Sequence, residues 1–351
     1  MWDYCSQLVG NNRKPKLWGN CSHLLGNHTI WVYFLWGYCM SPYISLIETL
    51  KYLCSLESFK EHIAFPKHNF ANAVLSDITD GSFIKSNPFH NTSQITFKIQ
   101  IYIDEFEPVN GMGYKIGIHK TSAIYFIIRN LPPFLNSKLK NIHLLSLLYA
   151  PDIKKYGYST ILSKLVSELK FLETEGIDVD FLKSPKNIKG SLAALSVDNL
   201  GANGLLGMVE SFSATYSCRH CLCDKTKMQN TFSESEVELR TPENYAIHLQ
   251  ELDQTLENNV FSIKHRCCLN ELNYFHIFQA PTADIMHDAL EGVAQWELIF
   301  IFQFIISENL MAKIQINNKI AAFNFGKLES TNLPNCITFD HETVGQKAAQ
   351  T

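Results

Sequence analysis

The feature that most constrains the fold of this chain is a strict alternation of apolar and polar residues just before Asp104. From Ile95 to Ile103, every second residue is isoleucine or phenylalanine, and the residues between them are polar or tyrosine. A period of two predicts a β-strand with one buried face. The chain is therefore expected to build a sheet, with Asp104 at the end of one strand.

Two further segments predict strands of the same core. Residues 121–129 (TSAIYFIIR) are stopped by the sequence Asn-Leu-Pro-Pro at 130–133, and residues 191–197 (SLAALSV) end at Asp198. Leucine and isoleucine residues at helical spacing over 159–175 predict a helix, which Gly176 stops. A second amphipathic helix is expected over 45–59. Together these elements predict an α/β fold.

Length and composition limit the domain organisation. The 351 residues correspond to two domains, or to one domain with a large insertion, at roughly 150 residues per domain. The share of hydrophobic residues is 46%, which excludes wholesale disorder. We expect an N-terminal segment without clear periodicity (1–60), the first part of the core (90–215), a Cys- and His-containing insertion (216–282), a final core helix (283–310) and a truncated tail (311–351).

Charge and hydropathy exclude several classes of protein. A net charge of −4 excludes a chain that coats nucleic acid with an overall basic surface. No apolar run reaches the ~18 residues that a membrane helix needs, so no membrane partner is expected. The N-terminus lacks the basic-then-apolar order of a signal peptide. The ten cysteines are therefore expected to be reduced thiols, some of them at a metal site.

Three acidic residues stand where α/β proteins place chemical groups. Asp104 follows the first strand, Asp198 follows the later apolar strand, and Glu291 lies on the last helix. Open α/β folds place their sites at the carboxyl ends of strands. Three carboxylates that meet there could hold two divalent ions about 4 Å apart, as in phosphodiester chemistry. The alternative is that each acid only caps a helix or a turn.

The last helix, expected over about 283–306, carries a narrow polar stripe on an otherwise apolar surface. The stripe has the spacing i, i+3, i+4, i+7 and i+11 and consists of Asp284, His287, Asp288, Glu291 and Gln295. It contains no lysine or arginine, which a solvated face usually carries. A site that faces a metal ion therefore competes with the simpler interpretation of a solvated face.

Cys218 and Cys221 form a CxxC pair, and Cys223 follows two residues later. Two thiolates at this spacing can hold half of a tetrahedral zinc site. The other half would come from two of six residues, of which we favour His276 and His287; the six are His248, His265, Cys267, Cys268, His276 and His287. Incidental cysteines are the alternative, and no thioredoxin-like βαβ context supports a redox pair.

Five segments in a fixed order resemble one family. They are IDEFEPVNG at 103–111, NLPP at 130–133, VDNLGANGLLG at 197–207, CRHC at 218–221 and DIMHDALEGV at 284–293. In this order they are similar to segments of transposases of the CACTA/En-Spm group, within the CMC superfamily. The resemblance covers roughly residues 90–310.

The resemblance implies a ribonuclease-H-like mixed sheet with flanking helices, interrupted by a Cys- and His-containing insertion before the last catalytic helix. It implies an acidic triad of Asp104, Asp198 and Glu291 that binds Mg²⁺ or Mn²⁺, cleaves DNA at element ends and transfers the 3′-hydroxyl to target DNA. It also implies zinc in the insertion, DNA as partner, homo-oligomers and a nuclear location. Because DIMHDALEG has two more residues between His and Glu than the plant pattern, Asp288 is a rival third ligand.

Other functions remain open at this stage. A catalytically inactive derivative that binds DNA or protein would keep the same fold. A zinc hydrolase would use His287, Asp284 and Asp288, but no HExxH motif is present. DNA binding needs basic side chains, and five lysines between the central helix and the strand before Asp198 either line a groove or form a solvated face. They are Lys164, Lys170, Lys183, Lys186 and Lys189.

Overall fold

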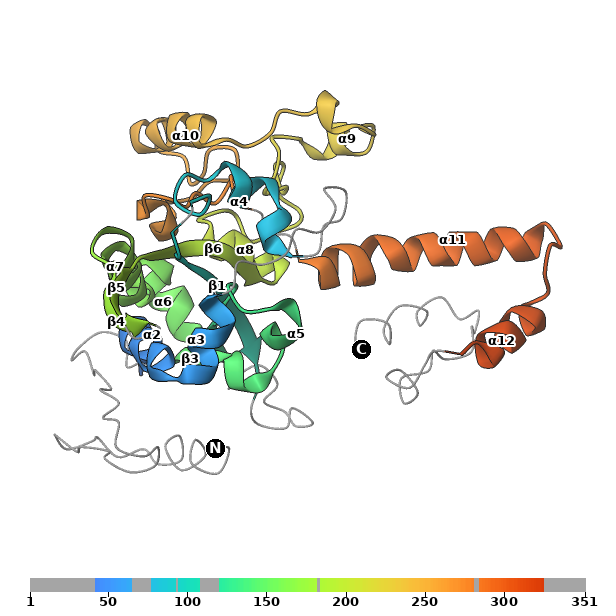
Figure 1. The fold of residues 1–351 in the computed structure, drawn as a ribbon. Coiled ribbons are helices and arrows are strands. Elements are labelled where there is room, and N and C mark those ends of the chain that lie inside the picture. Colours follow the sequence, from blue (N-terminus) through green and yellow to red (C-terminus); the bar gives the residue numbers. More distant parts are fainter. Residues whose placement is uncertain are drawn as a thin grey trace, which may run out of the picture.

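A four-stranded mixed sheet organises the chain in the computed structural model, which describes residues 42–64, 77–92, 94–107, 120–181, 184–280 and 284–324 (Figure 1). The strand order is β3-β2-β1-β6. β1 (Phe97–Phe106) pairs antiparallel with β2 (Thr121–Ile128), β2 pairs antiparallel with β3 (His143–Tyr149), and β1 pairs parallel with β6 (Gly190–Val197). The predicted α/β class is confirmed. Most of the predicted N-terminal segment, up to residue 41, and the tail from 325 lie outside the described residues.

Alternation in β1 creates the two faces of the sheet. Phe97, Ile99, Ile101 and Ile103 are each at most 5% exposed and form part of the main core. The strand continues to Phe106, two residues beyond the predicted end, because β2 pairs with it that far. Asp104 therefore lies within the strand.

Helices cover the apolar face of the sheet. α7 (Ser163–Thr174) packs against β6 and places Leu165, Leu169 and Leu172 in the core at 0 to 1% exposure. The helix predicted over 159–175 is in fact the end of α6 (Ala150–Ile161) followed by α7, with Leu162 between them. The sheet is thus flanked by helices, as the resemblance implied.

The N-terminal helices are attached through a buried carboxylate. The amphipathic segment predicted over 45–59 forms α2 (Leu46–Ser55) and α3 (Glu57–Ala64), which are separated at Leu56. Glu168 of α7 accepts hydrogen bonds from the Tyr43 hydroxyl at 3.0 Å and from Leu46 N at 2.8 Å. This carboxylate caps the first turn of α2, whose amide groups lack partners within the helix.

The remaining elements are short or belong to the insertion. β4 (Ile177–Phe181) and β5 (Ser184–Ile188) form a separate antiparallel hairpin. Short helices outside the sheet are η1 (Ile78–Asp80), α4 (Ser82–Ser86), α5 (Pro133–Asn136), η2 (Leu139–Asn141), α8 (Asn199–Leu205), α9 (Lys225–Met228), η3 (Glu234–Glu236) and η4 (Cys268–Glu271). The insertion also holds α10 (Pro242–Gln254), which begins with a Thr241–Asn244 capping box.

The insertion returns to the main core instead of forming a separate unit. Its last part, from Cys267 to Ala280, contributes seven buried side chains to the same core cluster as the sheet; they are Cys267, Cys268, Leu269, Leu272, Phe275, Ile277 and Ala280. A small second cluster of Tyr245, Leu249 and Ile263 stabilises the outer part. The segment between the sheet and the last helix is therefore anchored at its end.

The predicted last helix has two parts. A π-helix, η5 (Ile285–Val293), continues into α11 (Ala294–Ser307), and α12 (Lys313–Ala322) follows in the predicted tail. α11 extends away from the body of the molecule (Figure 1). By length and composition alone, 285–307 is one helix that could cross a membrane, contrary to the sequence-based expectation. One such helix is weak support for a membrane protein, although 285–307 is not buried inside the structure as the core helix of a soluble protein is.

Candidate functional site

Asp104 and Asp198 are neighbours at one end of the sheet. Parallel pairing sets Tyr102 opposite Ser196 and Ile103 opposite Val197, and the two aspartates directly follow these pairs. Neighbouring strands lie about 4.8 Å apart, and alternate residues share a face. Both aspartates are exposed. The sheet therefore places the two aspartates at neighbouring positions beside the carboxyl end of β6, although they are far apart in the sequence.

Each aspartate also has a local hydrogen bond. Asp104 Oδ1 accepts from Glu105 N at 2.9 Å. Asp198 is the N-cap of α8, and its Oδ1 accepts from Gly201 N at 2.6 Å. A Cβ at position 201 would lie 2.8 Å from this oxygen, so glycine permits the close approach. The capping alternative thus holds for Asp198, but the cap uses only one of its two carboxylate oxygens.

The sheet face beside Asp104 is polar and aromatic. Tyr102 of β1 stacks on Tyr125 of β2, with ring centroids 5.1 Å apart. Burial raises the pKa of Tyr125, and the negative charge of Asp104 raises it further. Gln100 donates to the Ser196 hydroxyl at 2.8 Å and links β1 to β6 on the same face. The carboxylates therefore border a half-buried surface of hydroxyl and amide groups.

The third acid of the predicted triad comes from the π-helix η5. Asp284 caps this helix by accepting from Met286 N at 3.0 Å and from His287 N at 3.3 Å. His287 Nδ1 bonds Asp284 Oδ2, and its Nε2 lies 4.0 Å from Glu291 Oε2. The predicted stripe assumed α-helical spacing. A π-helix bonds residue i to residue i+5, so the side chains of the stripe that lie together differ from those in an α-helix.

His287 contacts two acidic residues of the stripe, Asp284 and Glu291. The pKa of His287 is raised, chiefly by its hydrogen bond to Asp284 and further by the charges of Asp284, Glu291 and Asp198. The imidazole is therefore within electrostatic reach of both Asp198 and Glu291. Within the part of the chain that the structure describes, no three or more His, Cys, Asp or Glu side chains are arranged to hold a metal ion. Glu291 thus does not complete a metal site with the two aspartates in this arrangement.

Asp288, the rival third ligand, is engaged by two other elements. Its Oδ1 accepts from Asn199 Nδ2 at 2.8 Å, and its Oδ2 lies 3.2 Å from Arg219 Nη2. Arg219 Nη1 also donates to Asn199 Oδ1 at 2.6 Å, and Asp284 N donates to Asp288 Oδ2 at 3.1 Å. Sequence reasoning missed Arg219 and Asn199. Their only signal was that one lies inside the CxxC pair and the other follows Asp198.

The CxxC pair forms a tight turn. His220 N donates to Cys218 Sγ at 3.3 Å. Burial raises the pKa of the Cys221 thiol to about 11, and its hydrogen bond with Cys218 raises it as well. The buried side chain of Arg240 donates to Cys218 O at 3.0 Å and to Phe261 O at 2.9 Å, and Arg240 N donates to His220 O at 2.9 Å. The backbone of the turn is therefore fixed to the insertion.

The structure does not gather the four predicted zinc ligands, Cys218, Cys221, His276 and His287, into one group. His276 packs against the rings of Tyr245 and Phe278, at centroid distances of 5.6 and 5.8 Å. Burial lowers the pKa of His276. His287 instead bonds to Asp284.

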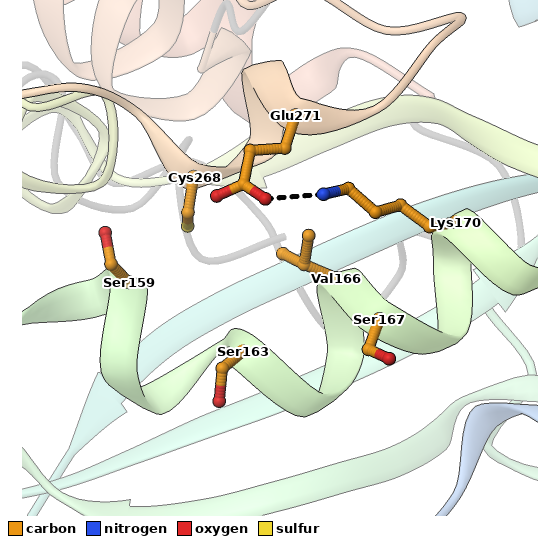
Figure 2. A pocket seen from close by; sticks show the side chains of 7 residues that line it. All are labelled: Ser159, Ser163, Val166, Ser167, Lys170, Cys268 and Glu271. Atoms are coloured by element: carbon orange, nitrogen blue, oxygen red, sulfur yellow. Dashed lines mark hydrogen bonds and ion pairs between the residues drawn. The ribbon is translucent and has the colours of Figure 1, made fainter.

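The cavity in Figure 2 lies between α7 and η4, and its lining does not include Asp104, Asp198 or Glu291. Its volume is about 240 Å³, and Lys170 and Glu271 form an ion pair of 2.5 Å beside it. Lys164 lies 3.5 Å from Glu168 on the same helix. Two of the five lysines considered for a DNA groove therefore have acidic partners. The other residues that line the cavity are Ser159, Ser163, Val166, Ser167 and Cys268.

Comparison with known proteins adds no assignment. No family model matches this chain, and no curated protein matches it either.

Proposed function

We propose that this chain is a DDE-type DNA transposase, or a protein derived from one, and that Asp104 and Asp198 are the centre of its active site. The observation that carries the proposal is that parallel pairing of β1 with β6 sets the two aspartates at neighbouring positions, Asp104 on β1 and Asp198 directly after β6. The sequence motifs that resemble CACTA/En-Spm transposases contain both residues. Two independent features, motif order and strand register, therefore select the same pair.

A ribonuclease-H-like fold is part of the proposal. In its support, three strands form an antiparallel meander, and a fourth joins the first strand in parallel after intervening helices. The first aspartate lies on the first strand, and the second follows the parallel strand. The insertion and the helix with Glu291 come later in the chain, in the order that the resemblance implies.

Two adjacent carboxylates suit a divalent cation. Mg²⁺ prefers oxygen ligands, and proteins commonly bind it through one or two carboxylates together with substrate phosphates. Asp104 and Asp198 supply such a pair, and both are open to solvent. When bound, the ion would supply Lewis acidity to the scissile phosphate and stabilise charge on the attacking and leaving oxygens.

The chain's own residues set the geometry of this reaction. The α8 cap fixes the rotamer of Asp198 through Gly201 N. Glu291 remains the proposed third carboxylate, which would hold the ion together with the two aspartates; its Oε2 lies 4.0 Å from His287 Nε2. Zinc at the Cys218–Cys221 turn, DNA as partner, assembly into homo-oligomers and a nuclear location belong to the same proposal.

The experiment is a nicking assay with the full chain, supercoiled plasmid DNA and Mn²⁺. We expect Mn²⁺-dependent nicking that D104N and D198N both abolish. The matched control is D224N, because Asp224 is also an N-cap aspartate whose side chain accepts from a backbone amide, that of Lys227 at 2.8 Å. Nicking that survives in D198N, or that D224N removes equally, would overturn the assignment.

A catalytically inactive derivative that binds DNA or protein is the second candidate. The observation in its favour is that no three ligating side chains among the described residues are arranged around a metal ion. This candidate predicts that the protein retains DNA in a filter-binding assay, without nicking at any Mn²⁺ concentration. D198N would then leave the retained fraction unchanged.

A further inference from the structure

Arg219 is a buried arginine in the CxxC turn, and its side chain forms an ion pair with Asp288 of η5. Its side chain is 8% exposed, whereas that of Asp288, its ion-pair partner, is 42% exposed. The turn that carries it is held by Arg240 and by the bond from His220 N to Cys218. The backbone on both sides of Arg219 is therefore held within the insertion.

The guanidinium connects two elements that flank the proposed active site. It donates to Asn199 at 2.6 Å and lies 3.2 Å from Asp288, and Asn199 donates to Asp288 at 2.8 Å. Asn199 follows Asp198 at the start of α8, and Asp288 lies three residues before Glu291 on η5. The three side chains form a closed triangle from α8, the insertion and η5.

We infer that Arg219 is a positioning residue, which couples the Cys218–Cys221 turn to the acidic site by holding η5 against the start of α8. Asp288 is then the anchor of η5 and not a metal ligand. Anything that stabilises the turn, such as a bound metal ion or intact thiols, stabilises the position of η5 through this contact. The catalytic meaning of the coupling rests on the proposed function, but the contact itself does not.

A charged pair at such a place stabilises local structure strongly. Hydrogen bonds to charged groups are stronger than neutral ones, and an unpaired partner in a partly buried place is costly. Residues that orient the groups of a metal site typically change affinity or activity about 10- to 100-fold when they are replaced. We therefore expect R219M to reduce nicking by about 10- to 100-fold.

Amide hydrogen exchange of the full chain tests the contact without relying on activity. R219M is expected to speed exchange in 285–293 and 199–205 by about tenfold, because both segments lose a common anchor. D288N should act on the same segments, and the double variant should exchange no faster than R219M alone. R219K keeps the charge and should restore part of the protection. The control is R266M, which breaks an exposed ion pair with Asp253 in the same insertion and should change neither segment.

The Cys turn supplies the second arm of the test. C218S/C221S is expected to speed amide hydrogen exchange in 285–293 in the wild-type background. In the R219M background, the same change should not speed exchange further. Unchanged exchange in R219M, or additive effects of the double variants, would refute the coupling even if the wild type nicks DNA. Faster exchange in R219M, in a protein that never nicks DNA, would support the coupling while overturning the proposed function.

Discussion

Replacing Glu173 should show that one buried carboxylate helps to hold the insertion against the sheet, in addition to the buried side chains that the insertion contributes to the main core. Glu173 of α7 is 2% exposed and accepts from the Ser191 hydroxyl at 2.5 Å, from Asn273 N at 2.8 Å and from Asn273 Nδ2 at 3.2 Å. These donors belong to β6 and to the insertion. The carboxylate therefore connects three parts of the fold.

The magnitude follows from these three bonds. A hydrogen bond to a charged group contributes about 1.5 to 3 kcal/mol, and the cost of burying the charge offsets part of this sum. We expect E173A to lower the free energy of unfolding by about 3 kcal/mol, because it leaves three donors without an acceptor. E173Q keeps one acceptor oxygen and the side-chain volume, so it should cost about 1 to 2 kcal/mol.

Urea unfolding at pH 7, followed by circular dichroism, measures both values. E175A, at an exposed position two residues further along, is the control and should stay within about 0.5 kcal/mol of the wild type. Hydrogen exchange in 267–280 should rise in E173A more than exchange in the strands. An E173A protein as stable as the E175A protein would refute the argument that this carboxylate joins the insertion to the core.

Three further predictions test other parts of the structure by the same unfolding measurement. D198A removes the cap of α8 and should cost about 1 kcal/mol, whereas D198N keeps a capping oxygen and should cost less than half of that; equal losses would contradict the cap. L169A, at a fully buried position of α7, should cost about 2 to 5 kcal/mol, and a smaller loss would mean that α7 does not pack on the sheet. Burial lowers the pKa of His90 from 6.5 to about 4, so the unfolded chain binds more protons between these values and stability should fall by up to about 3 kcal/mol as pH drops through this window. H90L should remove only the part of the slope that belongs to His90, because burial also lowers the pKa of His143 to about 4, and H62Q, at an exposed histidine, should keep the whole slope.

Three of the four strands of the sheet were predictable because they carry strong local patterns. Alternation before Asp104 and the apolar run before Asp198 indicated β1 and β6, and the residues after them became neighbours through parallel pairing. β3 was missed because residues 144–148 (LLSLL) are almost uniformly apolar and show no period of two. A short apolar run without alternation does not distinguish a strand from a helix.

The candidate site was only partly predictable. Sequence spacing suggested an α-helical stripe, but η5 has π-helical bonding, and nothing in a 3.6-residue pattern indicates that change. The contact between Arg219 and Asp288 joins residues from two distant segments, so it depends on how the insertion folds back. α10 was missed because the insertion has weak periodicity, although the Thr241–Asn244 capping box marks its start.

Mn²⁺ binding by the full chain and by D198N tests directly whether Asp104 and Asp198 form a cation site. The electron paramagnetic resonance signal of free Mn²⁺ measures how much of the ion the protein has bound. We expect wild-type protein to remove Mn²⁺ from solution, D198N and D104N each to lose this binding, and D224N to retain it. Equal binding by the wild type and D198N would show that Asp104 and Asp198 do not form a cation site, and would overturn the proposed active site.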